Sequence, residues 1–148
     1  MLRPLHALTW DNRFASLPDA FGERVGPTPL PDPWLVAFNP DVAALLDLDP
    51  AAAADPDFLA WVAGNLTLPG TDPVAAIYAG HQFGVWVPQL GDGRAILLGE
   101  VTSGNHQHWD VQLKGAGMTR FSRMGDGRAV LRSTIREYLA GEAMAGLG

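Results

Sequence analysis

Residues 91–137 read GDGRAILLGEVTSGNHQHWDVQLKGAGMTRFSRMGDGRAVLRSTIRE, and this stretch decides the fold of the chain. Apolar runs on either side of its first glycines predict two strands, at residues 82–90 and 95–101. Polar and apolar residues then alternate from Trp109 to Lys114, which predicts a third, half-buried strand. Three short consecutive strands most simply form an antiparallel meander.

A helix is predicted after these strands, over about residues 131–147. Its apolar residues recur at helical spacing and fall roughly on one face: Leu131, Ile135, Tyr138, Leu139 and Leu147. The order is therefore a glycine loop between two strands, a lysine (Lys114) on the next strand and a glutamate (Glu137) on the following helix. This order is typical of the N-lobe of a protein-kinase-like fold. We predict an α+β fold, with a small antiparallel sheet and a following helix.

The first eighty residues predict an irregular and helical N-terminal extension. Proline and glycine are frequent up to residue 33, which excludes long regular elements there, and residues 34–38 predict one short strand. Three short helices are expected after Asn-Pro or Asp-Pro pairs, which begin at Asn39, Asp55 and Asp72. Such a pair supplies an N-cap and then a proline at the first helical position. The predicted organisation is an extension over residues 1–80 and a kinase-like N-lobe core over residues 81–148.

Composition excludes several classes of protein. The 148 residues are 47% apolar, enough for a hydrophobic core, and contain no cysteine, which excludes a thiolate nucleophile and a cysteine metal site. No apolar run approaches the roughly 20 residues that cross a bilayer, and the N-terminus is a poor secretory signal. We therefore expect a cytoplasmic protein with no membrane role. The net charge of −6 argues against a general nucleic-acid binder. Residues 109–148 nevertheless carry 6 basic and 4 acidic residues, which suits a pocket for a small anion.

The glycine loop has two interpretations. In a hairpin turn, Gly91 and Gly93 would only supply backbone with positive φ. In a phosphate-binding loop, they would let backbone N–H groups approach phosphate oxygens, and Arg94 would add a planar guanidinium.

Lys114 and Glu137 also have two interpretations each. Lys114 is either a solvated strand end or a cation directed at phosphate, and Glu137 is either half of a capping box with Thr134 or the partner of the Lys114 ammonium. The glycine-rich connection between them is either a solvated loop or a source of charged groups near the site: Arg120, Arg123, Asp126 and Arg128. His106 and His108 could share a strand face, but no third ligand is apparent nearby, and we expect no metal site in the chain.

Four segments together resemble the selenoprotein O family, known in bacteria as YdiU. They are YAGHQFG at residues 78–84, PQLGDGRA at 88–95, WDVQLKGAGMTRFSR at 109–123 and GDGRAVLRSTIREYL at 125–139. The resemblance extends over nearly the whole chain. It implies a pseudokinase fold that acts as a protein adenylyltransferase, transferring AMP from ATP to Ser, Thr or Tyr hydroxyls of other proteins.

The resemblance also implies individual site residues. The positions that match the family's ATP-binding residues are Gly91, Gly93, Arg94, Lys114, Asp126 and Gly127. Glu137 matches the helix residue that forms a supporting ion pair with the lysine.

Members of the selenoprotein O family are much longer than 148 residues, and their catalytic aspartate and Mg²⁺ ligands belong to a second lobe. We therefore expect this chain to be the N-terminal portion only, with no catalytic or metal-binding residue and no activity alone. The expected cofactors are ATP and Mg²⁺, and the expected partners are protein substrates. Two alternatives stay open: a non-catalytic nucleotide-binding or protein-interaction module, and a kinase-type phosphotransferase.

Overall fold

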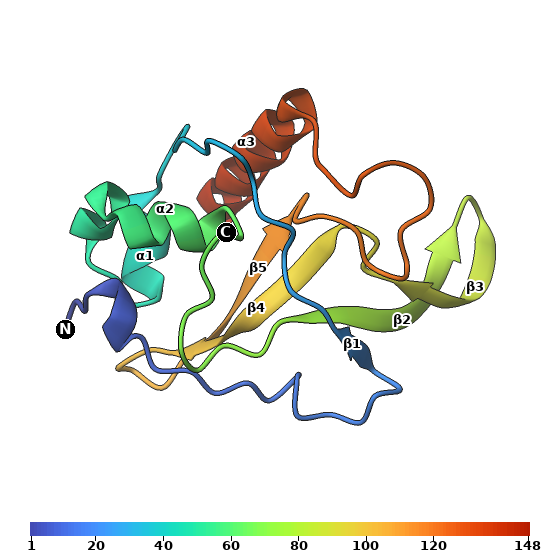
Figure 1. Ribbon diagram of the computed structural model, residues 1–148, viewed down its shortest axis with the longest axis horizontal. Coiled ribbons are helices and arrows are strands. Elements are labelled where there is room, and N and C mark those ends of the chain that lie inside the picture. The colour runs from blue at the N-terminus through green and yellow to red at the C-terminus, as the bar shows by residue number, and fades with distance from the viewer.

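Five strands and five helical segments make up the chain, which a computed structural model describes over residues 1–148 (Figure 1). In chain order they are η1 (Leu5–Ala7), β1 (Gly22–Arg24), α1 (Pro40–Leu45), η2 (Pro50–Ala54), α2 (Pro56–Val62), β2 (Val74–Gln82), β3 (Val85–Gly91), β4 (Ala95–Thr102), β5 (His108–Lys114) and α3 (Leu131–Leu147). The predicted α+β class and the small sheet with a following helix are confirmed. None of the helical segments combines the length and the apolar character of a membrane-spanning helix.

The sheet is antiparallel throughout, and its longest strand, β2, organises it. The order is β1-β2-β4-β5, while β3 pairs with the distal half of β2, from Ile77 to Gln82. Since β3 and β4 both run antiparallel to β2, they run in the same direction and are joined by residues 92–94. The predicted meander is therefore wrong at this step, because β3 and β4 are not neighbouring strands. The tight turn lies instead at Phe83 and Gly84, which have φ of +52° and +79°.

Two of the three expected helices are confirmed by their caps. The side chain of Asn39 accepts hydrogen bonds from the backbone N–H groups of the first turn of α1, and Asp55 does the same for α2. The third expected helix, after Asp72, is wrong because this segment forms β2. The Asp-Pro signal is the same, but the residues that follow pair with β1, β3 and β4, and sheet pairing overrides the local signal. The strand expected at residues 34–38 is also absent.

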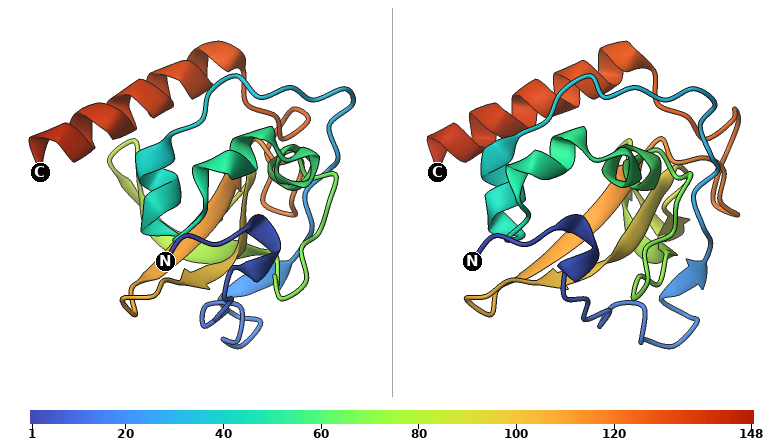
Figure 2. Two further views of the ribbon diagram at one scale, coloured as in Figure 1. Left: turned by 90° about the vertical axis from the view of Figure 1, so that its left-hand side faces the viewer. Right: turned by 60° about the vertical axis from the view of Figure 1, so that its left-hand side comes forward.

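One hydrophobic core joins the N-terminal helices to the sheet. Figures 1 and 2 show α1, η2 and α2 against the β4–β5 side of the sheet. Trp61, which is 3% exposed, packs edge-to-face on Trp10 and Phe58 with ring centroids 5.9 Å and 6.1 Å away. The same cluster contains Ile96 and Val101 of β4. The core thus includes residues from both sides of position 80, and the division of the chain there stays a prediction.

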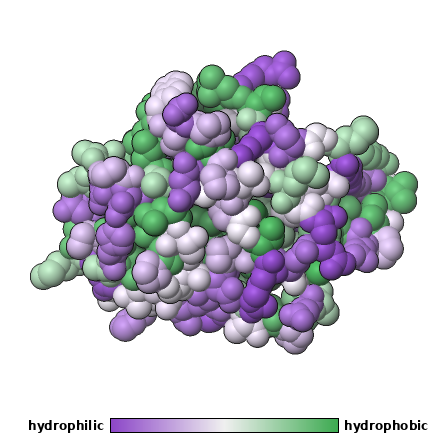
Figure 3. Space-filling view, in the orientation of Figure 1, coloured by the Kyte–Doolittle hydropathy of each residue, from purple (hydrophilic) through white to green (hydrophobic).

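Helix α3 lies at the outside of the molecule, and its C-terminal end projects from the body (Figure 2). None of its residues is buried, and the apolar residues of its predicted face are exposed. Two side chains tie it to the rest of the chain: Glu137 contacts Lys114, and Glu142 accepts a hydrogen bond from Asn39 at 2.7 Å. Figure 3 shows hydrophobic surface over this helix and over the β2–β3 hairpin.

Candidate functional site

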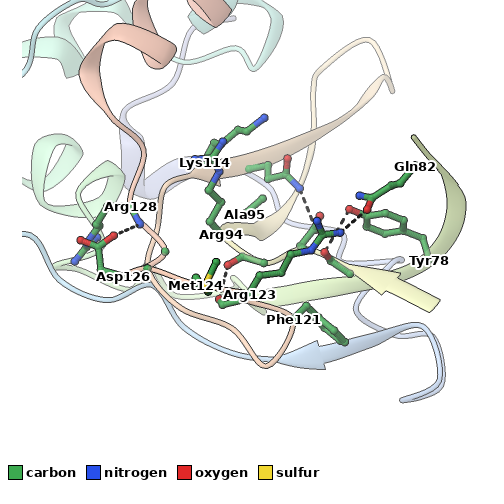
Figure 4. Close-up of a pocket in the computed structure, with 17 residues that line it drawn as sticks. Tyr78, Gln82, Arg94, Ala95, Lys114, Phe121, Arg123, Met124, Asp126 and Arg128 are labelled. Atoms are coloured by element: carbon green, nitrogen blue, oxygen red, sulfur yellow. Dashed lines mark hydrogen bonds between the residues drawn. The ribbon is translucent and has the colours of Figure 1, made fainter. Parts of the chain in front are cut away.

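A pocket of about 730 Å³ lies where β3, β4 and β5 meet the loop before α3 (Figure 4). Its lining includes all six residues that the sequence suggested for ATP: Gly91, Gly93, Arg94, Lys114, Asp126 and Gly127. They come from the β3–β4 junction, from the end of β5 (Lys114) and from the loop after it. The fold thus brings the predicted residues together, and their role in ATP binding stays a prediction.

Gly91 is required by the close packing of the loop on the β3–β4 junction. A Cβ at this position would lie 2.3 Å from Cγ of Phe121, whose ring covers it. The Thr119 hydroxyl donates to the carbonyl of Asp92 at 2.5 Å, and the Ser122 hydroxyl donates to the carbonyl of Gly93. Neither glycine has positive φ, so the hairpin-turn interpretation is wrong. Because these glycines have no Cβ, the loop after β5 can pack directly against them and form one wall of the pocket.

Asp92 is a pocket residue that the sequence reasoning did not single out. Its carboxylate accepts hydrogen bonds from the backbone N–H of Ala76 at 3.2 Å and from Nε2 of Gln112 at 3.4 Å. Burial raises the pKa of Asp92, while the Ala76 hydrogen bond and the charge of Lys114 act against that rise. These contacts join the junction to β2 and β5. The sequence feature that could have indicated this contact is the alternation of β5, which places Gln112 and Lys114 on one face of the strand.

Lys114 and Glu137 form the ion pair that the sequence order suggested. The Lys114 Nζ lies 3.0 Å from Oε2 of Glu137, and both side chains are about half exposed. The hydrogen bond from Lys114 is the main cause that lowers the pKa of Glu137. The capping-box alternative is wrong, because α3 begins at Leu131 and Thr134 lies inside it, donating to the carbonyl of Val130 at 3.3 Å.

The titration of Glu137 gives a direct check on this ion pair. Because the pKa of Glu137 is lowered, the ion pair is fully formed at a pH above 4.5, the ordinary pKa of a glutamate. The pair is lost as the pH falls through the lowered pKa. We expect Lys114→Met to raise the pKa of Glu137 toward 4.5, measured from the carboxyl carbon shift by NMR. Arg136→Met is the matched control and should move it far less, because Arg136 is the weakest of the causes. An unchanged pKa in Lys114→Met would show that the pair does not form in solution.

Side-chain and backbone hydrogen bonds position the loop after β5 beside the pocket. Oδ1 of Asp126 accepts a hydrogen bond from the N–H of Arg128 at 2.9 Å, and the Gly127 carbonyl accepts one from the N–H of Gly117 at 3.2 Å. Arg128 donates through Nη2 to the carbonyl of Pro29 at 2.9 Å. These contacts give residues 126–128 a defined place beside the pocket, while residues 123–126 are exposed.

The pocket is electropositive. Its lining carries four cationic side chains, Arg94, Lys114, Arg123 and Arg128, and two carboxylates, Asp92 and Asp126. Arg120 lies outside this lining, contrary to expectation, because it turns toward Glu23 at 3.9 Å and lies over the ring of Phe121. An excess of cations beside ordered backbone suits a polyphosphate group.

The two histidines lie away from the pocket. His106 is in the β4–β5 turn with φ of +62°, and Nδ1 of His108 lies 3.6 Å from Asp11. No three His, Asp or Glu side chains gather in a group that could hold a metal ion.

The fold and the lysine–glutamate pair define this chain as the N-lobe of a protein-kinase-like fold. Comparison with known proteins then gives the family. A family model described as "Protein adenylyltransferase SelO" matches residues 4–148. The chain belongs to the SelO family, and its sequence-based assignment is confirmed.

Similar proteins share the name "Protein nucleotidyltransferase YdiU". The chain is 59% identical to the one from Thiobacillus denitrificans over 143 residues, 97% of this chain and 29% of that protein. It is 60% identical to the one from Myxococcus xanthus over 144 residues, 97% of this chain and 30% of that protein. It is 60% identical to the one from Bordetella avium over 148 residues, 100% of this chain and 30% of that protein. The chain thus spans about 30% of the length of these relatives, whose names place it in a nucleotidyltransferase family.

Proposed function

We propose that this chain supplies the ATP-binding N-lobe of a protein adenylyltransferase, which transfers AMP to Ser, Thr or Tyr hydroxyls of proteins. One observation carries the proposal: a single electropositive pocket collects all six expected ATP-binding residues, with the Lys114–Glu137 ion pair at its edge. The name of the family and those of the relatives support the same reaction class.

The chemistry explains why such a pocket is useful. A protein hydroxyl attacks the α-phosphorus, the new oxygen–phosphorus bond forms, and the bond to the bridging oxygen breaks as pyrophosphate leaves. The hydroxyl proton passes to a base, and negative charge gathers on the phosphate oxygens. Arg94 and Lys114 would hold and neutralise those oxygens, and Glu137 would keep the ammonium in place. This is catalysis by positioning and charge.

The pocket has two carboxylates of its own, Asp92 and Asp126, and no group of three His, Asp or Glu side chains that could hold a metal ion. We therefore propose that the catalytic base and the Mg²⁺ ligands lie in the part of the relatives that this chain does not cover. Mg²⁺ would supply further charge neutralisation there, and the chain alone would bind ATP without transferring AMP.

Calorimetric titration with ATP and Mg²⁺ tests the binding site. We expect saturable binding by the wild-type chain and binding about 10- to 100-fold weaker in Lys114→Ala, since a charge-assisted hydrogen bond contributes about 1.5–3 kcal/mol. Arg132→Ala is the matched control, because it removes one positive charge from α3 outside the pocket lining. Equal affinities in Lys114→Ala and Arg132→Ala would overturn the assigned role of Lys114.

Labelled ATP distinguishes the reaction classes in a form extended to the full length of the relatives. Label transferred to protein from the α-phosphate identifies adenylylation, and label from the γ-phosphate identifies a phosphotransferase. Binding without transfer of either label identifies a nucleotide-binding module.

A further inference from the structure

Arg123 differs from the other anchored cations of the pocket in what holds it. Lys114 is paired with the carboxylate of Glu137, and Arg128 donates to the backbone carbonyls of Pro29 and Gly115. Arg123 forms no ion pair. Its Nη2 donates instead to Oε1 of Gln82. A neutral amide, like the neutral carbonyls that hold Arg128, orients a guanidinium without neutralising it, so the full positive charge of Arg123 stays available to an anion.

Gln82 belongs to the β2–β3 hairpin. It is the last residue of β2, paired with Val85 across the β2–β3 turn, and the next pair, His81 and Trp86, brings two rings into edge-to-face contact at 5.1 Å. The amide that contacts Arg123 therefore comes from the turn end of a paired hairpin. Figure 4 shows the Arg123 side chain extending toward Gln82 and Tyr78, away from Asp126 and Arg128.

The backbone before Arg123 is fixed as well. The N–H of Thr119 donates to the hydroxyl of Ser122 at 2.9 Å, and the N–H of Ser122 donates to the carbonyl of Thr119 at 3.1 Å. The same two hydroxyls bind the β3–β4 junction. Arg123 is thus constrained at its backbone by this turn and at its guanidinium by Gln82.

A second cavity of about 400 Å³ adjoins the first at this point. Both cavities are lined by Tyr78, Gln82, Gly91, Phe121 and Arg123. Arg123 therefore lies at the hairpin end of the site, where the main pocket continues along β3.

We propose that Arg123 is a phosphate-binding residue at the β2–β3 end of the pocket, and that Gln82 is its positioning residue. This inference rests on the proposed ATP-binding function. It adds to the site a second kind of cation, one that is positioned by the β2–β3 hairpin and not by β5. Polyphosphate would therefore extend from Lys114 and Arg94 toward the hairpin.

The rival explanation is that the Arg123–Gln82 contact only ties the loop to the hairpin. Gln82→Glu separates the two. A carboxylate keeps the acceptor oxygen and forms a stronger contact with the guanidinium, so a tether would be preserved or strengthened. The same carboxylate neutralises Arg123 and repels phosphate, so a phosphate-binding residue would lose its function.

The experiment is a titration of ATP, and separately of inorganic tripolyphosphate, into the wild-type chain and four variants. They are Arg123→Ala, Gln82→Glu, Gln82→Met and Lys114→Ala, each checked by circular dichroism and urea unfolding. We expect Arg123→Ala and Gln82→Glu to bind both probes about 10-fold more weakly, with Gln82→Glu at least as stable as wild type. Gln82→Met, which removes the acceptor but adds no charge, should lose less affinity.

The outcomes separate this inference from the proposed function. Wild-type affinity in Gln82→Glu or Arg123→Ala, together with weak binding by Lys114→Ala, overturns the role of Arg123 alone. Absence of ATP binding by a folded wild-type chain overturns both. Loss of tripolyphosphate binding in parallel with ATP supports contact with the phosphates.

Discussion

Trp61→Ala is expected to lower the free energy of unfolding by about 3–5 kcal/mol, the usual cost of truncating a buried tryptophan. Trp61 is 3% exposed and packs against Trp10 and Phe58. Its side chain lies in the core that the N-terminal helices share with β4. Removing the Trp61 ring leaves a cavity. Its walls belong to separate segments of the chain, which cannot all move to fill it. This loss is a large fraction of the free energy of unfolding of a typical domain.

Urea unfolding followed by far-UV circular dichroism measures this loss, with Trp34→Ala as the matched control. Trp34 is 71% exposed, so the same truncation there should change the free energy by no more than about 0.5 kcal/mol. Trp61→Phe should fall between the two, because it keeps a ring in the cluster. Similar losses at positions 61 and 34 would mean that the extension does not share a core with the sheet.

Short sequence patterns correctly predicted those helices and strands whose formation depends on residues close by in the sequence. The N-caps of α1 and α2, the alternation of β5 and the periodicity of α3 are all readable over a few positions. The Lys114–Glu137 pair followed from the order of the elements, a lysine strand and then a glutamate helix, which is typical of a protein-kinase-like N-lobe. Residues 115–130 separate β5 from α3, so closeness in sequence alone would not bring the two side chains together.

The errors arose where distant residues decide the outcome. The segment after Asp72 has a helix-start signal, but its backbone groups pair with β1, β3 and β4. Arg120 belongs to the same loop as Arg123, yet the position of Glu23, nearly a hundred residues earlier, turns it away from the pocket. The role of Gly91 depended on Phe121, which no pattern around residue 91 reveals. Tertiary contacts of this kind are absent from any short window of sequence.

The glycines of the site have a common physical basis that their spacing did not show. At Gly91 and Gly127 the obstacle to a side chain is the protein itself: the ring of Phe121 in one case and the backbone of Gly117 in the other. The motif GDGRA occurs twice, at residues 91–95 and 125–129, and both copies lie against the 117–121 part of the loop. These glycines therefore let three backbone segments assemble into the wall of the pocket before any ligand is present.

Gly127→Ala should accordingly destabilise the chain by about 2–5 kcal/mol and reduce ATP affinity by more than 10-fold. Gly127 has φ of +71°, and a Cβ there would lie 2.1 Å from the carbonyl carbon of Gly117. The left-handed backbone costs an L-residue about 1–2 kcal/mol, and overpacking against backbone adds about 1–3 kcal/mol. Relief requires residues 126–128 to move away from the pocket, which displaces Asp126 and frees Arg128 from Pro29.

Gly125→Ala is the control that separates strain from contact. Gly125 also has positive φ, +103°, but a Cβ there would meet nothing within 4 Å. It should therefore show the cost of backbone strain while leaving ATP affinity within about 3-fold of wild type, because the loop need not move. Urea unfolding and ATP titration of both variants give the comparison. If Gly125→Ala and Gly127→Ala lose the same stability and the same affinity, the close approach of Gly127 to Gly117 does not shape the pocket, and the loop reaches the nucleotide by another arrangement.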